Sequence, residues 1–155
     1  MTTLQSYIAG RWIGQQSAQQ LRSAVNGQPV ASTHAEAIDF AEALAHARRV
    51  GLPALMALDF QQRAERLKAL AKHLAAHKET LYAISAHTGA TRTDSWIDIE
   101  GGAGTLAAYA GIGSNELPSG NLVHEGPAFA LGKKGGFAGT HILVPRGGVA
   151  VHINA

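Results

Sequence analysis

The sequence predicts an α+β fold in which short strands at both ends of the chain flank a helical middle. Three observations predict it: apolar and polar residues alternate within residues 6–32, apolar residues recur every three or four positions within 33–112, and glycine-separated apolar runs follow residue 128. The fold class expected is therefore N-terminal strands, then three helices, then further strands at the end.

Residues 6–32 are expected to form small antiparallel strands. The stretch SYIAGRWIG alternates around Tyr7, Ile8, Trp12 and Ile13, with Gly10 between two short runs, as a hairpin does. The pair Asn26 and Gly27 then supplies a second turn signal.

The first two helices are predicted from capping signals and apolar repeats. Thr33 and Glu36 have capping-box spacing, which predicts a helix from Thr33 that ends near Gly51 and Pro53. A stronger helix begins at the N-cap Asp59 and runs to Gly89, with a break expected near residues 76–78 because about thirty residues is long for a globular helix. Its apolar face is expected to comprise Leu67, Leu70, Leu74, Leu81 and Ile84.

A third helix is expected to open on Asp94 or Ser95, weakened by Gly101, Gly102 and Gly104. Residues 113–128 have loop composition, and three strands are expected after them, divided by turns at 132–136 and 145–148. The last strand, GGVAVHINA at 147–155, has the apolar run of a strand covered on both faces. Since the preceding residues supply no neighbour for it, we expect it to be frayed, displaced or paired with another chain.

Composition places the chain among globular proteins and excludes several functions. With 155 residues, 46% apolar and 15% charged, the chain is long enough for one domain but has no apolar run that could cross a membrane. The net charge of +2 comes without a basic, aromatic-rich stripe, so no nucleic-acid partner is expected. The absence of cysteine excludes thiolate chemistry from these residues and, with no secretory signal, favours a cytoplasmic location.

Two short motifs suggest binding sites, and each has a simpler explanation. Gly102, Gly104 and Ala107 fit the G-x-G-x-x-A turn of a dinucleotide site, but the acidic stretch DSWIDIE precedes them instead of a buried strand, which favours chance or close helix packing. His73 and His77 stand four residues apart without a third ligand, so solvated helix histidines are favoured over zinc. No metal site and no catalytic residue is assigned.

Two longer stretches carry a resemblance: HTGATRTDSWIDIEGGAGTLAAYAG at 87–111 and HILVPRGGVAVHINA at 141–155. The sequence resembles the aldehyde dehydrogenase superfamily over essentially its whole length. Within it, TGATRTDSWIDIEGG is similar to the PaaZ-type bifunctional enzymes of phenylacetate breakdown, which combine an oxepin-CoA hydrolase with a CoA-linked semialdehyde dehydrogenase. The resemblance implies the α/β aldehyde dehydrogenase fold, of which these residues form an N-terminal fragment that is inactive alone.

The resemblance also implies roles for particular residues. The backbone of Ile153, Asn154 and Ala155 matches the strand end that borders the ribose of an NADP cofactor, at the start of the cofactor domain (147–155). Gly101 and Thr105 match a helix that lines the substrate tunnel, with plain helix packing as the alternative for the glycine. Strand 137–145, within a hairpin region at 129–145, matches the strand through which family members form homo-oligomers. The catalytic Cys and Glu of the family match no residue here.

Several functions therefore stay open at the level of sequence. The first is a fragment of an NAD(P)-dependent dehydrogenase whose substrate is a CoA-linked semialdehyde, either of the phenylacetate type or the shorter one of benzoyl-CoA breakdown. The second is a non-enzymatic helical module that dimerises through its strands. The third is a free-standing dinucleotide binder built on Gly102 and Gly104.

Overall fold

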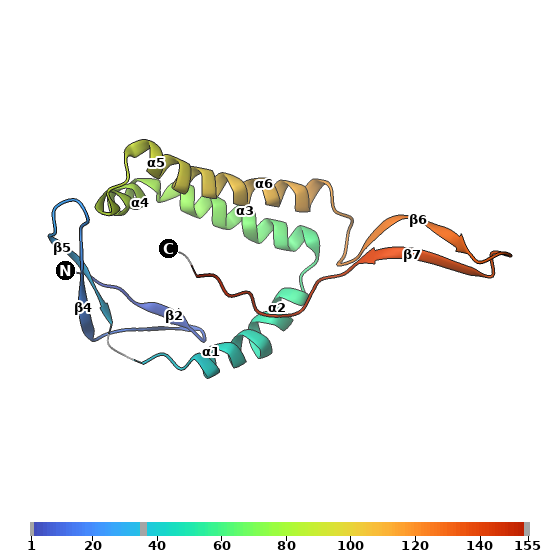
Figure 1. Cartoon of the computed structure of the whole chain (residues 1–155), viewed down its shortest axis with the longest axis horizontal. Coiled ribbons are helices and arrows are strands. Elements are labelled where there is room, and N and C mark those ends of the chain that lie inside the picture. Colours follow the sequence, from blue (N-terminus) through green and yellow to red (C-terminus); the bar gives the residue numbers. More distant parts are fainter. Residues whose placement is uncertain (1, 35–36, 154–155) are drawn as a thin grey trace.

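The computed structural model describes residues 2–34 and 37–153. Within these residues, five short strands come first, six α-helices with three tighter or wider helical turns follow, and a long hairpin comes last (Figure 1). The strands are β1 (Thr2–Thr3), β2 (Ser6–Ile8), β3 (Arg11–Ile13), β4 (Ser17–Arg22), β5 (Pro29–His34), β6 (Val123–Leu131) and β7 (Phe137–Leu143). The helices are α1 (Phe40–His46), α2 (Leu52–Met56), α3 (Phe60–Ala76), α4 (Lys78–Ser85), α5 (Arg92–Trp96) and α6 (Gly102–Asn115). The π-helical turns are η1 (Ala47–Gly51) and η3 (Ile97–Gly101), and η2 (Ala86–Thr88) is a 3₁₀ turn.

The helix expected from Asp59 is confirmed, including its ends. The Asp59 carboxylate accepts from the Gln62 backbone N–H at 2.7 Å, and the Gln62 side chain accepts from the Asp59 N–H at 3.0 Å, so the capping box is complete. The helix stops at Ala76, and α4 starts after His77, where the break was expected. Gly89 takes a left-handed φ of +89°, as a C-terminal glycine does.

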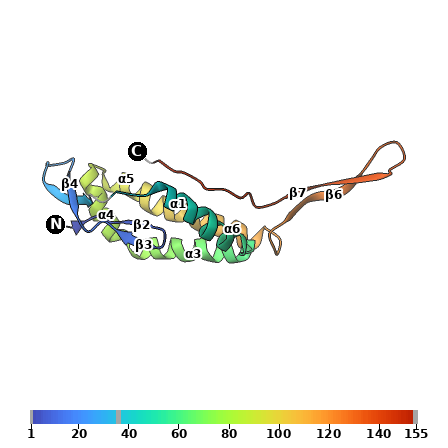
Figure 2. The ribbon, with the colours of Figure 1, turned by 90° about the horizontal axis from the view of Figure 1, so that it is seen from below.

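Small residues, not leucines, form the closest contact between α3 and α6, which lie side by side (Figures 1 and 2). Their buried residues are Ala64, Ala71, Ala103, Ala110 and Gly113. A Cβ atom on Gly113 would lie 2.9 Å from the Ala64 Cβ, so the two backbones approach as closely as glycine allows. The expected apolar face is therefore only partly correct, because Leu70 and Ile84 are exposed.

Two expected helix starts are wrong: strand pairing takes up the backbone at Thr33, and a capping box that starts three residues earlier begins the third helix. Thr33 lies in β5, which pairs with β4, and α1 instead begins after Asp39, whose carboxylate caps the Glu42 N–H at 2.9 Å. The helix then continues past Gly51 to Met56, since η1 and the first turn of α2 accommodate Pro53. The third helix is capped by Thr91, with Asp94 as the reciprocal partner three residues later.

The strands form three separate small sheets. β1, β5 and β4 make one sheet, in which β4 and β5 are antiparallel and β1 and β5 are parallel, and β2 and β3 make a hairpin that pairs Tyr7 with Trp12. The antiparallel strands expected within 6–32 are thus present. β6 and β7 form a hairpin that extends away from the helices (Figure 1). It starts at Val123, so the loop expected at 113–128 is shorter than predicted, and 132–136 is the turn, as expected.

The third C-terminal strand is missing from the described residues. Residues 144–153 form no strand and return from the hairpin toward the helices, passing α2 (Figures 1 and 2). Residues 147–155 were expected to be frayed, displaced or paired with another chain. Residues 147–153 form no strand within the described part of the chain, which agrees with the first two alternatives, while Asn154 and Ala155 lie outside the described residues.

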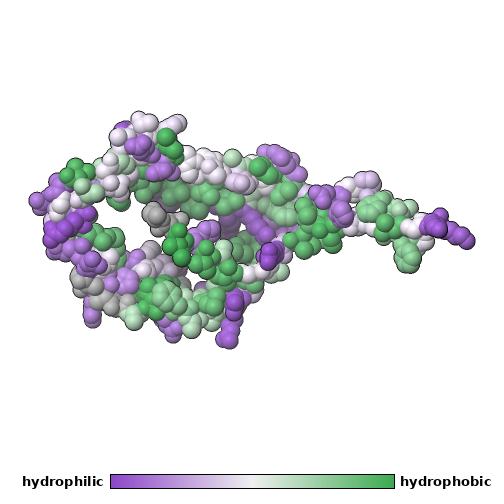
Figure 3. All heavy atoms as spheres, in the orientation of Figure 1, coloured by the Kyte–Doolittle hydropathy of each residue, from purple (hydrophilic) through white to green (hydrophobic). Residues whose placement is uncertain are grey.

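The molecule exposes far more surface than a closed domain of its size. Its accessible area is 11694 Å² at 16.2 kDa, whereas a compact protein of that mass exposes roughly 7,500 Å². Apolar side chains beside the C-terminal segment border an open hollow (Figure 3). Within the described residues, no helix combines the length and the apolar character needed to cross a bilayer.

Candidate functional site

A groove of about 460 Å³ lies between α3, the start of α4 and α6. Its floor is apolar and its rim is basic. The groove, called the lysine groove below, is lined by Lys68, Ala71, Lys72, Ala75, Lys78, Ile99, Glu100, Ala103, Gly104 and Ala107. Its volume falls within the range of small-molecule sites, roughly 300–1,000 Å³.

Helical spacing brings the lysines to this rim. Lys68 and Lys72 are four residues apart on α3, one turn, so both project along the same side of the buried Ala71. Lys78 follows the break at His77 and enters from the start of α4. The alanines and Gly104 leave the groove open because none carries a side chain beyond Cβ that would fill it.

Only one of the three ammonium groups is neutralised within the described residues. Lys78 Nζ lies 3.4 Å from Glu100 Oε2, while Lys68 and Lys72 have no carboxylate within ion-pair distance among those residues. Tyr82 Oη donates to Glu100 Oε1 at 2.6 Å. That hydrogen bond, more than the nearby lysine, lowers the pKa of the Glu100 carboxyl, and the same contact raises the pKa of Tyr82. The groove therefore carries a net positive charge at neutral pH.

Gly101 and Thr105 lie one turn apart and exposed at the start of α6. Thr105 Oγ1 donates to the Gly101 carbonyl oxygen at 3.0 Å, which turns its hydroxyl back onto the helix. A Cβ atom on Gly101 would meet nothing within 4 Å, so helix packing does not explain this glycine. Gly113 is the packing glycine of α6 instead.

The dinucleotide motif has no structural support. Gly102 and Gly104 lie inside an unbroken helical run from α5 through η3 to α6, so a helix and not a strand leads directly into them. Added Cβ atoms at both positions would meet open space, so close packing does not account for them either. Ile153, expected to border a cofactor ribose, is 93% exposed and has no strand neighbour among the described residues.

The His73 and His77 rings contact each other at a tilt of 38°, with centroids 4.4 Å apart. His77 Nδ1 lies 2.9 Å from the His73 carbonyl oxygen. No group of three potential metal ligands occurs in residues 2–34 and 37–153. The two rings thus meet where α3 ends and α4 begins.

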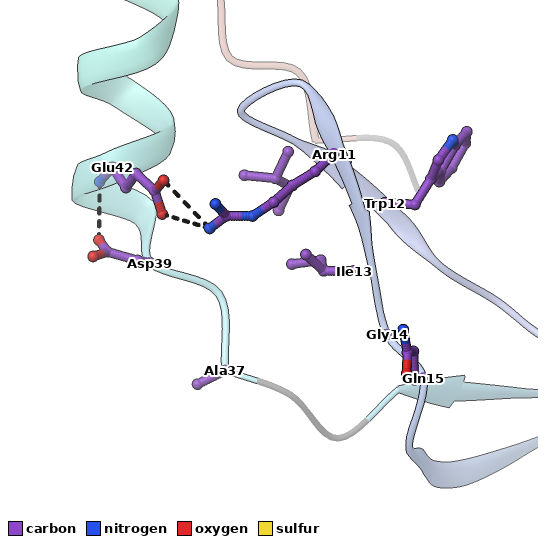
Figure 4. A pocket seen from close by; sticks show the side chains of 9 residues that line it. Arg11, Trp12, Ile13, Gly14, Gln15, Ala37, Asp39 and Glu42 are labelled. Atoms are coloured by element: carbon purple, nitrogen blue, oxygen red, sulfur yellow. Dashed lines mark hydrogen bonds and ion pairs between the residues drawn. The ribbon is translucent and has the colours of Figure 1, made fainter.

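A second cavity, of about 350 Å³, lies between the β2–β3 hairpin and the start of α1 (Figure 4). Arg11 reaches across it and donates to both Glu42 carboxylate oxygens, at 3.1 and 3.3 Å. Asp39 is occupied as the cap of α1. Arg11 and Glu42 thus neutralise each other, and the remaining negative charge of the cavity, on Asp39, is engaged in capping α1.

Sequence reasoning missed the lysine groove and the Tyr82–Glu100 contact. The four-residue spacing of Lys68 and Lys72 beside Ala71 and Ala75 was a readable signal for the groove. No local sequence pattern predicts the hydrogen bond of Tyr82, because its partner Glu100 belongs to a different helical segment eighteen positions later.

Comparison with known proteins gives a consistent picture. The model of the aldehyde dehydrogenase family matches residues 12–132. A curated relative from Aromatoleum evansii, described as a 3,4-dehydroadipyl-CoA semialdehyde dehydrogenase, is 38% identical over 154 residues. The alignment covers 98% of this chain but 30% of the relative, so the chain spans less than a third of the relative's length.

Proposed function

Because the chain belongs to the aldehyde dehydrogenase family, we propose that it is the N-terminal part of an NAD(P)-dependent dehydrogenase, with NADP as the expected cofactor, that oxidises a CoA-linked semialdehyde. In this proposal the 155 residues contribute substrate contacts and an assembly strand, while the catalytic Cys and Glu come from elsewhere in the full-length protein.

The lysine groove is the observation that carries the substrate class. Coenzyme A presents several phosphate groups joined to a long, partly apolar arm. Lys68 and Lys72 supply cations at the rim, and lysine binds phosphate as a point charge. The alanine-lined floor suits the less polar part of such a molecule. The name of the Aromatoleum evansii relative specifies a substrate of the same class.

Gly101 and Thr105 are proposed to form the wall along the acyl chain, called the acyl wall below. Both residues are exposed, and nothing occupies the space beside Gly101, so a bulky chain could pass there. The relative's name specifies an adipyl chain. The phenylacetate-type alternative is a longer one, and a comparison of turnover with the two chain lengths distinguishes them.

The cofactor is proposed to bind mainly outside these residues. The described part of the chain contains no glycine-rich phosphate loop after a strand, and Ile153 is unsupported. The described residues therefore do not fit a nicotinamide dinucleotide by themselves, and we derive no step through it.

The β6–β7 hairpin is proposed to join copies of the protein, through strand 137–145. It is a two-stranded ribbon with both edges open and with exposed apolar side chains, among them Leu131, Phe137 and Leu143. Such a ribbon is marginal in water until another strand or surface covers it. A second copy offers the same ribbon and so a self-complementary partner.

The direct test is reduction of NADP by the full-length gene product with a CoA-linked semialdehyde, compared with the same semialdehyde as a free acid. We expect efficient turnover of the CoA-linked form, weak turnover of the free acid, and none from the 155-residue chain alone. Equal turnover of both forms would contradict the assignment of CoA. A 155-residue chain that dimerises, with no dehydrogenase encoded after it, would instead support the non-enzymatic module.

A further inference from the structure

A π-helical turn includes the first residue of the acyl wall. η3 spans Ile97–Gly101, so the glycine of the wall is its last residue. Ser95 before the turn and Ala103 after it are both buried, although they are eight residues apart. In an uninterrupted α-helix these two side chains would point about 80° apart, whereas a turn that absorbs one extra residue brings them to within about 20°. The π turn therefore lets α5 and α6 bury the same side of the helical run.

Three polar side chains hold that turn. They are Lys78 and Tyr82 from α4 and Glu100 from η3, called the clamp below. Tyr82 Oη donates to Glu100 Oε1 at 2.6 Å, and Lys78 Nζ lies 3.4 Å from both Glu100 oxygens. Because the accepting carboxylate precedes Gly101 by one residue, the clamp acts on the π turn itself and not on the regular helices beside it.

The tyrosine is itself held in place. Its side chain is buried, and the guanidinium carbon of Arg92 lies 3.5 Å from the ring centroid. Arg92 in turn pairs with Glu79 at 3.3 Å. With ring and hydroxyl both fixed, Tyr82 can determine where Glu100 sits, since a hydrogen bond to a charged acceptor is among the stronger ones in proteins.

We propose that Tyr82 is a positioning residue for substrate selection: through Glu100 it fixes the π turn at Ile97–Gly101 and so the placement of the acyl wall. The proposal rests on the proposed function, in which Gly101 and Thr105 border the acyl chain. Tyr82 does not contact substrate. Through the placement of the acyl wall it determines which aldehyde chains fit beside Gly101 and Thr105.

The test is Tyr82→Phe in the full-length protein, which removes the hydroxyl and keeps the ring under Arg92. We expect faster hydrogen exchange at the amides of η3 relative to those of α3. We also expect the KM for the CoA-linked semialdehyde to rise roughly tenfold with kcat retained, while the KM for propanal, too short to reach the wall, stays unchanged. The matched control is Tyr7→Phe, at an exposed tyrosine on β2.

Glu100→Gln is the second variant and decides the matter if Tyr82→Phe does not fold. The amide keeps an acceptor for Tyr82 but loses the charge, so faster exchange at η3, smaller than in Tyr82→Phe, is expected. Because Glu100 also lines the lysine groove, the KM effect of this variant is read as the ratio of the KM values for two CoA-linked semialdehydes of different chain length, which the groove charge affects equally. A folded variant with unchanged exchange at η3 overturns the clamp, and faster exchange without a change in KM pattern overturns the positioning role. Exchange needs no substrate, so a full-length protein that rejects CoA-linked semialdehydes would refute the proposed function and leave the clamp to be judged by exchange alone.

Discussion

The α3–α6 pair and the β6–β7 hairpin differ in how far each element satisfies its own backbone hydrogen bonds and covers its own apolar surface. In the helical pair, every interior backbone group bonds within its own helix, and a stripe of alanine and glycine closes the contact. In the hairpin, half of the backbone groups face outward at two open edges, and Phe137 is 76% exposed. The comparison indicates that the helices supply a framework by themselves, while the hairpin needs another surface.

The largest expected effect is on assembly, and it tests the hairpin side of the comparison. Leu131 and Phe137 face each other across the ribbon. Replacing both with Asp should place charges in the proposed interface and weaken association by about 3 kcal/mol or more. Light scattering of the full-length protein should show smaller assemblies.

The control for assembly is Lys134→Asp, in the turn outside both strands, which should leave the mass unchanged. If the double variant keeps the wild-type mass, the hairpin is not the assembly surface.

The next effect tests the helical side. Gly113→Val would push a branched side chain against Ala64 and should destabilise the protein by about 2–3 kcal/mol. Gly102→Ala, where an added Cβ meets nothing, should instead be neutral or stabilising by up to about 1 kcal/mol. Urea unfolding followed by tryptophan fluorescence measures both, and equal midpoints for the two variants would contradict the packing described here.

A smaller effect is expected at the lysine groove, which the helical pair creates. Lys68→Ala and Lys72→Ala should each raise the KM for the CoA-linked semialdehyde by roughly five- to tenfold, about the energy of one charged contact, and leave the KM for the free acid alone. Added salt should reduce the difference between variant and wild type. Lys133→Ala at the hairpin turn is the matched control, and a similar rise in that variant would refute the groove as the binding site.

The smallest effect concerns the clamp and pH. The hydrogen bond from Tyr82 lowers the pKa of Glu100, so its contribution to stability is present above the unfolded value of about 4.3 and is lost as pH falls through the lowered pKa. The pKa of Tyr82 is raised by the same bond, so its contribution is present below about pH 10 and is lost as pH rises through the raised value.

Urea midpoints of the wild type and Tyr82→Phe should therefore differ at neutral pH and converge at both extremes. Tyr109→Phe, at an exposed tyrosine on α6, should follow the wild type throughout. A constant difference between wild type and Tyr82→Phe from acid to alkaline pH would exclude the hydrogen bond as its source.

Local sequence signals predicted the helix ends and turns correctly wherever a few adjacent residues determine the backbone conformation. The capping box at Asp59, the break at 76–78 and the turn at Gly89 depend on neighbours within one helical turn, and all three are present. Thr33 shows the limit of such signals. Its capping spacing was genuine, but pairing of β5 with β4 satisfies the backbone there through contacts more than ten residues away.

The candidate site likewise contains some residues that the sequence could nominate and some features that only helix packing creates. Gly101 and Thr105 could be nominated from the sequence by resemblance, and the structure leaves both exposed at the start of α6. The groove, the π turn and the clamp could not, because each needs the angle and register between α3, α4 and α6.

By itself, the sequence determined the helical middle, the antiparallel strands and the C-terminal run without a neighbour, since caps, glycines and apolar periods act over a few residues. Only the tertiary structure decided that alanines rather than leucines form the contact between α3 and α6. It also decided that three lysines line the groove beside that contact and that Tyr82 donates a hydrogen bond to Glu100. The physical reason is distance along the chain: these contacts depend on how separate helices pack, which no local pattern specifies.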